Sequence, residues 1–112
     1  MITLHELLME KFKVRTRAVV NPKVSEIGTT PGQILGNNPN RLAFVIINLH
    51  ATQSIYLGLD SSVASTKGIK IDPAGGSLKM VWDEDFQITS WAIWGVGSGA
   101  GTTCYVLEVV SY

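Results

Sequence analysis

Residues 48–80 read NLHATQSIYLGLDSSVASTKGIKIDPAGGSLKM, and this stretch decides the fold class. Short apolar runs alternate in it with glycine, asparagine, aspartate and serine, the residues that favour turns. Residues 72–75, Asp-Pro-Ala-Gly, have proline at the second position and glycine at the fourth, as in a type I turn. The stretch therefore predicts short antiparallel strands joined by tight turns.

Strand signals extend on both sides of this stretch. From residue 41 onward, apolar runs recur about every 8–12 residues with turns between them, which is typical of a sandwich or barrel. Upstream, residues 14–20 alternate as a strand with one wet face does, and residues 21–40 predict an ordered loop or a pair of very short strands. The fold class expected for residues 14–112 is an antiparallel β-sandwich, jelly-roll-like. Its later strands are expected at residues 42–48, 54–59, 69–71, 78–82, 86–94 and 103–110.

Residues 1–13 precede this domain and predict one short N-terminal helix. Thr3 is a candidate N-cap, and Glu6 follows it at the capping-box spacing. Ile2 and Leu7 stand at the positions of a hydrophobic staple. A helix this short is marginal alone, so its apolar face must dock on its own sheet or on a neighbouring subunit. That face carries Leu4, Leu7, Leu8 and Phe12.

The composition is poor in charge. The chain has 112 residues, enough for one domain. Only 16% of its residues are charged, against about 25% in a typical soluble domain, and 46% are hydrophobic. We therefore expect part of the surface to be covered by other subunits, in a homo-oligomer. No apolar run approaches the ~18 residues of a membrane span, and no signal peptide is recognisable, so no membrane partner is expected.

The charges are unevenly distributed. Residues 1–23 hold five basic and two acidic side chains, a net charge of +3, and the remainder carries −3. Two interpretations stay open: a basic arm that meets an acidic partner, or lysines and arginines that protect an edge strand. Phe12 is the only aromatic residue in this segment, which makes nucleic acid an unlikely partner. The basic residues are Lys11, Lys13, Arg15, Arg17 and Lys23.

The sequence holds few groups for chemistry. His5 and His50 are far apart and lack the spaced partners of a metal site. The acidic residues 83–85 are more typical of a solvated turn than of a calcium site. Residues 97–101 are glycine-rich but lack the lysine and helix of a phosphate loop, so we expect a hairpin turn. Cys104 is the single cysteine and is expected as a small buried hydrophobe. We predict no enzymatic activity, no metal and no cofactor.

The tryptophans suggest which faces are core. If residues 83–85 form a three-residue loop, the two flanking strands align their side chains by parity. Trp91 and Ile93 then lie on the face opposite the core, where an exposed tryptophan would anchor an interface; the alternative is that a second sheet of the same chain covers them. Gln87 and Thr89 share that face. The expected core row is Leu78, Met80, Trp82, Phe86, Ile88 and Trp94.

The last strand divides in the same way. We place Tyr105, Leu107 and Val109 in the core, because Glu108 on the other row would be costly to bury unpaired. That other row also holds Cys104, Val106 and Val110. Taken together, the helix stripe, the basic segment and the outward tryptophan define a candidate self-association interface. Its residues are Leu4, Leu8, Phe12, Arg15, Arg17, Trp91 and Ile93.

Several turn and strand motifs in residues 39–80 belong together. They are Pro39-Asn40-Arg41 before an apolar strand that Asn48 closes, Ile55-Tyr56-Leu57-Gly58, Ser61-Ser62-Val63, Gly68-Ile69 and Pro73. This pattern resembles small virion proteins of tailed phages and related prokaryotic viruses. The terminal strand also fits, whereas the N-terminal helix is not part of the pattern.

The resemblance implies a non-enzymatic viral structural protein. Such proteins are β-sandwich components of the capsid, its decoration, the fibre base or the tail, and they self-assemble. It further implies other virion proteins as partners and a location in the virion, after assembly in the host cytoplasm. An alternative function is a carbohydrate-binding module that uses exposed aromatic side chains such as Trp91.

Overall fold

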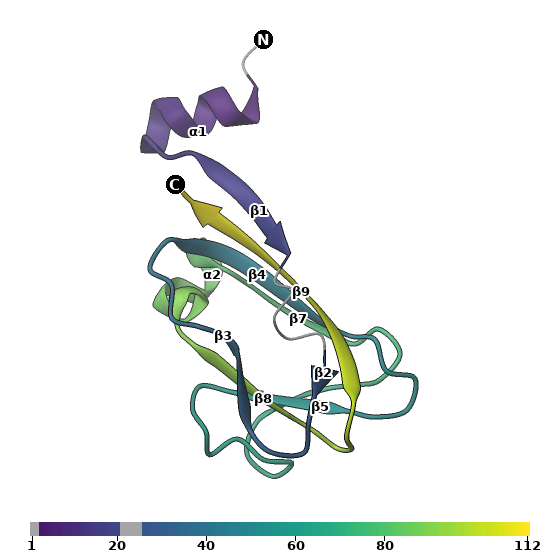
Figure 1. The fold of residues 1–112 in the computed structure, drawn as a ribbon. Helices are drawn as coiled ribbons and strands as arrows, with labels where there is room; N and C mark the ends of the chain where they lie inside the picture. The colour runs from purple at the N-terminus through teal and green to yellow at the C-terminus, as the bar shows by residue number, and fades with distance from the viewer. Residues whose placement is uncertain (1–2, 21–25) are drawn as a thin grey trace.

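The computed structural model describes residues 3–20 and 26–112, and the fold is mainly β (Figure 1). Two antiparallel sheets pack together, and a short N-terminal helix stands apart from them, as the fold class expected from the sequence requires. The elements are α1 (Leu4–Phe12), β1 (Thr16–Val20), β2 (Glu26–Ile27), β3 (Gly32–Leu35), β4 (Arg41–Asn48), β5 (Ile55–Gly58), β6 (Ile69–Ile71), β7 (Ser77–Val81), α2 (Trp82–Asp85), the 3₁₀ helix η1 (Phe86–Ser90), β8 (Ile93–Gly97) and β9 (Thr102–Ser111).

The strand order is that of a jelly roll. One sheet has the order β1-β9-β4-β7, with β2 pairing farther along β9, and the other has the order β3-β8-β5-β6. If β1 and β2 are counted as one interrupted strand, each sheet has four strands. From β3 onward, every connection except that between β5 and β6 crosses to the other sheet. This is the eight-stranded, double-sheet arrangement of two Greek keys, and it confirms the sequence prediction.

The core lies between the two sheets and is built by alternation. On β4 the buried residues include Phe44, Ile46 and Asn48, and their neighbours in the chain are only half-buried. Ile55 and Leu57 on β5 face them from the other sheet and are almost completely buried. Each such apolar side chain contributes about 1.5–3 kcal/mol through burial. Leu78 and Met80 pack against this core, as expected.

The inward row of β9 is opposite to the one predicted. Glu108 and Val106 are buried, with Cys104 and Val110, whereas Tyr105 is exposed and Leu107 and Val109 are half-buried. The prediction assumed that Glu108 has no partner. In the structure Arg41 pairs with it, because a bulge in β4 after Arg41 allows both side chains to be buried.

The predicted loop at residues 83–85 and the predicted strand at residues 86–94 differ from the structure. Trp82 begins the short helix α2, Phe86 begins η1, and β8 starts only at Ile93. Acidic residues in a first helical turn are favourable, and the carboxylate of Asp85 accepts a hydrogen bond from the Val81 backbone N–H at 2.8 Å. As a result Trp82 and Phe86 are 49% and 76% exposed and do not belong to the core.

Two turns also differ from expectation. Ala74 has a φ of +61°, which fits the third position of a type II turn and not of a type I turn. Residues 97–101 do not form a hairpin, because β8 and β9 lie in different sheets and this segment crosses between them. For the predicted loop or strand pair at residues 21–40, the short strands β2 and β3 favour the strands, and residues 21–25 lie outside the described residues.

The helix α1 has the caps that its sequence predicts. The Glu6 backbone N–H donates to the Thr3 hydroxyl at 3.2 Å, and Lys13 ends the helix in the left-handed conformation. Ile2, the expected staple residue, lies outside the described residues. No residue of α1 is buried. The molecule is therefore elongated, with a longest extent of 48 Å and a radius of gyration of 15.1 Å, against about 13 Å for a compact domain of this length.

Candidate interaction surface

The outer face of the β1-β9-β4-β7 sheet is largely apolar. The strand register places Ala18, Val109, Ala43 and Val81 in one row across four strands. Outward faces of antiparallel sheets are usually polar, and contiguous apolar surface marks interaction sites. We call this surface the outer sheet face. Its apolar part consists of Ala18, Val20, Ala43, Val45, Ile47, Val81, Tyr105, Leu107 and Val109, all of them exposed or half-buried, and the exposed Ser77 and Lys79 lie on the same side along β7.

One strand explains why this face exists. The prediction that the strand beginning near Arg41 is apolar on both sides is confirmed, because β4 lies between β9 and β7 in the middle of the sheet. One of its rows builds the core. The other row, Ala43, Val45 and Ile47, points away from the core, and no second layer of the described chain buries it.

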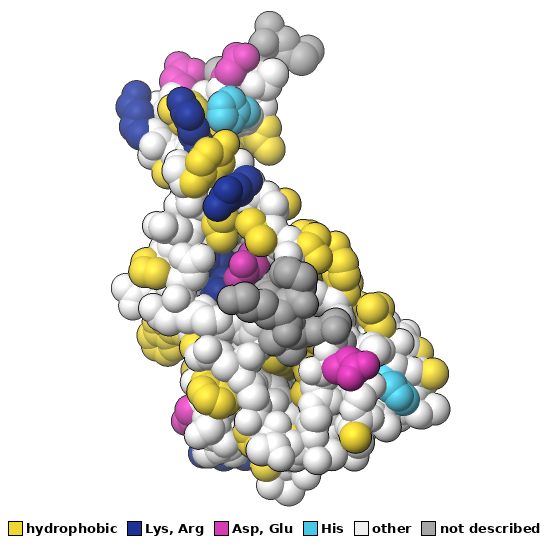
Figure 2. Space-filling model, in the orientation of Figure 1, with side chains coloured by type: hydrophobic (Ala, Val, Ile, Leu, Met, Phe, Trp, Pro, Cys, Tyr) yellow, Lys and Arg dark blue, Asp and Glu magenta, His cyan; other side chains and the backbone are white. Residues whose placement is uncertain are grey.

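A groove connects the outer sheet face with α1. It encloses about 450 Å³. The Phe12 ring meets the Trp82 ring edge-on across it, with 6.4 Å between the ring centroids. Hydrophobic side chains gather on the helix and at its junction with the sandwich (Figure 2). We call this feature the apolar groove, and only Thr16 among its lining residues is polar: Leu4, Leu8, Phe12, Val14, Thr16, Leu42, Ala43, Val81, Trp82 and Val109.

Three residues of the predicted interface come together in this groove. Leu4 and Leu8 line it from the helix, together with Phe12, and Leu4 is 70% exposed. Trp91 is 42% exposed but does not line the groove. The prediction that Ile93 is exposed beside Trp91 is wrong: Ile93 is 2% exposed and belongs to the core, because β8 begins at Ile93 and its alternation starts there.

Of the two arginines of the predicted interface, Arg17 lies on an edge strand and Arg15 directly before it. β1 pairs only with β9 in its sheet. Arg15 precedes it, and the Arg15 carbonyl accepts a hydrogen bond from the Tyr112 N–H at 2.9 Å. The Arg17 guanidinium lies over the Tyr112 ring, 5.3 Å from its centroid. This placement is what edge protection requires; an acidic partner stays a prediction.

Sequence reasoning missed Trp82 and Leu42 as groove residues. The sequence predicts Trp82 in the core because it predicts a loop at residues 83–85. Their acidic composition is also that of a first helical turn, and this signal would have ended the strand before Trp82. Leu42 reaches the groove because β4 bulges between Arg41 and Ala43, and no sequence signal for the bulge is apparent.

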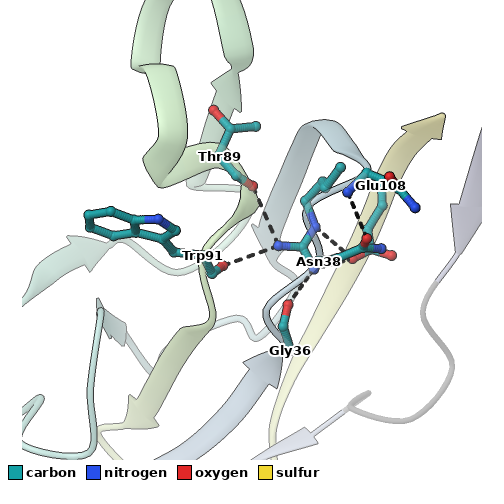
Figure 3. A network of polar contacts seen from close by, with 7 residues as sticks. Gly36, Asn38, Thr89, Trp91 and Glu108 are labelled. Carbon is teal, nitrogen blue, oxygen red and sulfur yellow. Dashed lines mark hydrogen bonds and ion pairs between the residues drawn. The ribbon is translucent and has the colours of Figure 1, made fainter. Parts of the chain in front are cut away.

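A buried polar network holds the segment at residues 82–91, which carries exposed aromatic side chains (Figure 3). The Arg41 Nε and Nη2 atoms lie 2.8 and 2.7 Å from Glu108 Oε1. Arg41 Nη1 donates to the carbonyls of Thr89 and Trp91 at 3.4 and 3.1 Å, and Nη2 donates to the Gly36 carbonyl at 2.7 Å. The guanidinium thus donates four hydrogen bonds and forms an ion pair with Glu108. Arg41 therefore fixes η1 against both sheets and is not free to bind a ligand.

Reactive groups are scattered in the described part of the chain. His50 Nδ1 accepts hydrogen bonds from the Thr52 and Gln53 N–H groups, and His5 lies on α1. Nowhere in residues 3–20 and 26–112 do three His, Cys, Asp or Glu side chains gather as a metal site would need. Burial raises the pKa of the Cys104 thiol to about 11. None of the described helices is long and apolar enough to cross a membrane.

Comparisons with protein-family models, with curated proteins and with solved structures give no match for this chain. The features that bear on function are therefore the outer sheet face, the apolar groove and the resemblance of residues 39–80. A fold alone does not imply a function.

Proposed function

We propose that this protein is a non-enzymatic viral structural protein that self-assembles through the outer sheet face and α1. The observation that carries this proposal is the uncovered apolar row Ala18, Val109, Ala43 and Val81. Its partners are further copies of itself and other virion proteins. Its place is the virion, as a capsid-associated, decoration, fibre-base or tail component assembled in the host cytoplasm.

Two further observations support the proposal. Double-sheet jelly rolls occur in viral capsid and lectin domains, which agrees with the resemblance of residues 39–80 to small phage virion proteins. The composition agrees as well, because only 16% of residues are charged. A surface poor in charge and rich in apolar side chains is stabilised when a neighbour covers it, by roughly 25 cal/mol for each Å² removed from water.

Sedimentation velocity tests the self-association. We expect the parent chain to form an oligomer at micromolar concentration. Leu107→Glu places a charge in the middle of the outer sheet face without touching the core, so it should shift the protein to a monomer. Ser61→Glu, in an exposed loop, is the matched control and should leave the oligomer intact. A monomeric parent, or an oligomer that tolerates Leu107→Glu, would show that this face does not mediate assembly.

The virion assignment has its own test. Virus particles that carry the gene can be purified and their proteins identified by mass spectrometry. We expect the chain in the particles at a stoichiometry set by particle symmetry. Its absence from purified particles would overturn the assignment even if the protein self-assembles.

A second candidate function is carbohydrate binding. Trp82 and Phe86 line a hollow of about 330 Å³ together with the polar residues Gln87 and Ser90, and Trp91 is also exposed. Aromatic rings beside hydrogen-bonding side chains suit a sugar ring. Glycan-array binding that is lost in Trp82→Ala or Trp91→Ala would support this function, and an array without signal would remove it.

A further inference from the structure

The helix α1 has an apolar stripe that the described residues of its own chain leave largely uncovered. Leu4 and Phe12 are 70% and 55% exposed, and no residue of the helix is buried. A nine-residue helix is not stable in water without packing. Its ring contact within the described residues, between Phe12 and Trp82, is at its C-terminal end. The helix therefore needs a second surface to cover its stripe.

We propose that α1 of a second copy of this chain occupies the apolar groove, and that the two copies exchange helices around a two-fold axis. The two helices then lie antiparallel and cross near Leu8. This inference rests on the proposed self-assembly and specifies its geometry.

The length of the helix agrees with the width of the sheet that lines the groove. A helix of nine residues is about 14 Å long. The groove is lined from β1, β9, β4 and β7, and four strands place the outer two about 14 Å apart. One α1 helix laid across the strands therefore spans the groove from edge to edge.

The symmetry follows from where the two surfaces lie. Groove and stripe belong to the same chain, so one two-fold contact covers both surfaces on both copies. Leu8 is the middle residue of Leu4–Phe12. An antiparallel pair centred there brings Leu8 against Leu8 of the second copy, and Leu4 against Phe12 of the second copy.

The helix dipoles favour the antiparallel over the parallel arrangement. In an antiparallel pair centred on Leu8, Lys11 lies opposite His5 of the second copy, whereas a parallel pair would bring Lys11 beside Lys11 of the second copy. Glu6 and Glu10 are one turn apart on the side of the helix that faces away from the stripe, so they do not decide between the two arrangements.

The outer sheet face alone is too small for a stable interface, so the helix must add contact area. Four strands are about 19 Å wide, and β4, with eight residues, is about 27 Å long. Even a face as long as β4 throughout has a footprint of only about 500 Å², whereas a stable interface buries about 800 Å² on each partner. The helix and the groove supply the missing contact area.

Cross-linking of the full-length chain with a short bis-maleimide tests the geometry. Leu8→Cys should give a covalent dimer, because the two Leu8 positions meet at the axis. Leu4→Cys and Phe12→Cys should each give much less dimer alone and should cross-link when the two variants are mixed. Glu10→Cys, on the opposite side of the helix, is the control and should stay monomeric on denaturing gels. Cys104 is buried and does not contribute while the protein is folded.

Each result has a distinct meaning. Strong self-cross-linking of Leu4→Cys as well as Leu8→Cys would show parallel helices and overturn the proposal. An oligomeric parent with no Leu8→Cys cross-link, and with an oligomer unchanged by Leu8→Glu, would overturn helix exchange while leaving self-assembly intact. A monomeric parent would overturn both. Helix exchange is supported only if Leu8→Cys cross-links and Leu8→Glu shifts the oligomer to a smaller species.

Discussion

Arg41 on β4 and Glu108 on β9 form a buried ion pair that joins neighbouring strands of one sheet, with 2.7 Å between Nη2 and Oε1. The same guanidinium donates to three backbone carbonyls outside that sheet. The pair therefore connects the packed sheets through η1 and the segment before β8. Because Arg41 makes these additional hydrogen bonds, replacing Arg41 and replacing Glu108 should affect stability to different extents.

We expect Glu108→Gln to lower the free energy of unfolding by about 3–5 kcal/mol, because it leaves a buried charge without its counter-charge. Arg41→Met should cost more, since it also leaves the carbonyls of Thr89, Trp91 and Gly36 without this donor. Urea denaturation measures both. The control is Asp72→Asn in the exposed pair with Lys70, which should change stability by at most about 1 kcal/mol. Equal effects of all three variants would contradict this ranking.

The two buried threonines are expected to respond in opposite ways. Among the described residues, no group accepts from or donates to the buried Thr89 hydroxyl, so Thr89→Val should be neutral or stabilising. The Thr102 hydroxyl bonds with the Gln53 side chain at 2.6 Å and with the Gly99 carbonyl at 2.9 Å. Thr102→Val should therefore cost about 1–3 kcal/mol. Thermal denaturation of both variants is the measurement, and a larger loss for Thr89→Val would contradict the assignment.

Cys104 should make stability fall at high pH. Its ordinary pKa is 9.0, and burial raises it to about 11 in the folded protein. Between these values the unfolded chain loses the thiol proton while the folded chain keeps it, so raising the pH favours unfolding. This part of the stability is complete below pH 9 and lost as the pH rises through 11. Cys104→Val should remove this component from the pH profile measured by urea denaturation; an unchanged profile would show that other groups cause it.

At position 86, glycine should give a more stable protein than alanine. Phe86 has a φ of +58°, which a bulky side chain rarely adopts, and its side chain is 76% exposed. Such strain costs about 1–3 kcal/mol, and glycine relieves it whereas alanine does not. We therefore expect Phe86→Gly to be more stable than Phe86→Ala in chemical denaturation, the reverse of the usual order. The usual order would mean that this backbone conformation is not strained.

Assembly should be nearly independent of salt if Arg15 and Arg17 protect the edge of β1. Exposed charges are screened over about 8 Å at physiological ionic strength, whereas apolar contacts are not. Sedimentation at low and high salt distinguishes the two interpretations of the basic segment. Marked weakening of the oligomer at high salt would show that these arginines meet an acidic partner.

The sandwich could be predicted because its signals are local. The fold class is indicated by turn residues at regular spacing and by the strand at residues 42–48, which is apolar on both sides. Neither signal depends on knowing which distant residues are in contact. Which row of β9 side chains faces the core could not be predicted, because it depends on Arg41, which is 67 positions before Glu108. The exposure of Trp82 depends on whether three acidic residues form a loop or a helical turn, and both are compatible with the sequence. The groove was missed because the β4 bulge that brings Leu42 to it has no local signature.

The pairing of β1 with β9 places the first and the last strand of the sandwich side by side, with Thr16 opposite Ser111. During synthesis on a ribosome, β1 emerges before the other strands but has no neighbour until β9 has been made. β4 likewise lacks β9 on one edge throughout that period. Contacts between such distant segments make folding slow, so this sheet closes only after β9 has emerged. Until then, each nascent chain exposes an open β4 edge at which another unfinished copy, or a chaperone, can bind.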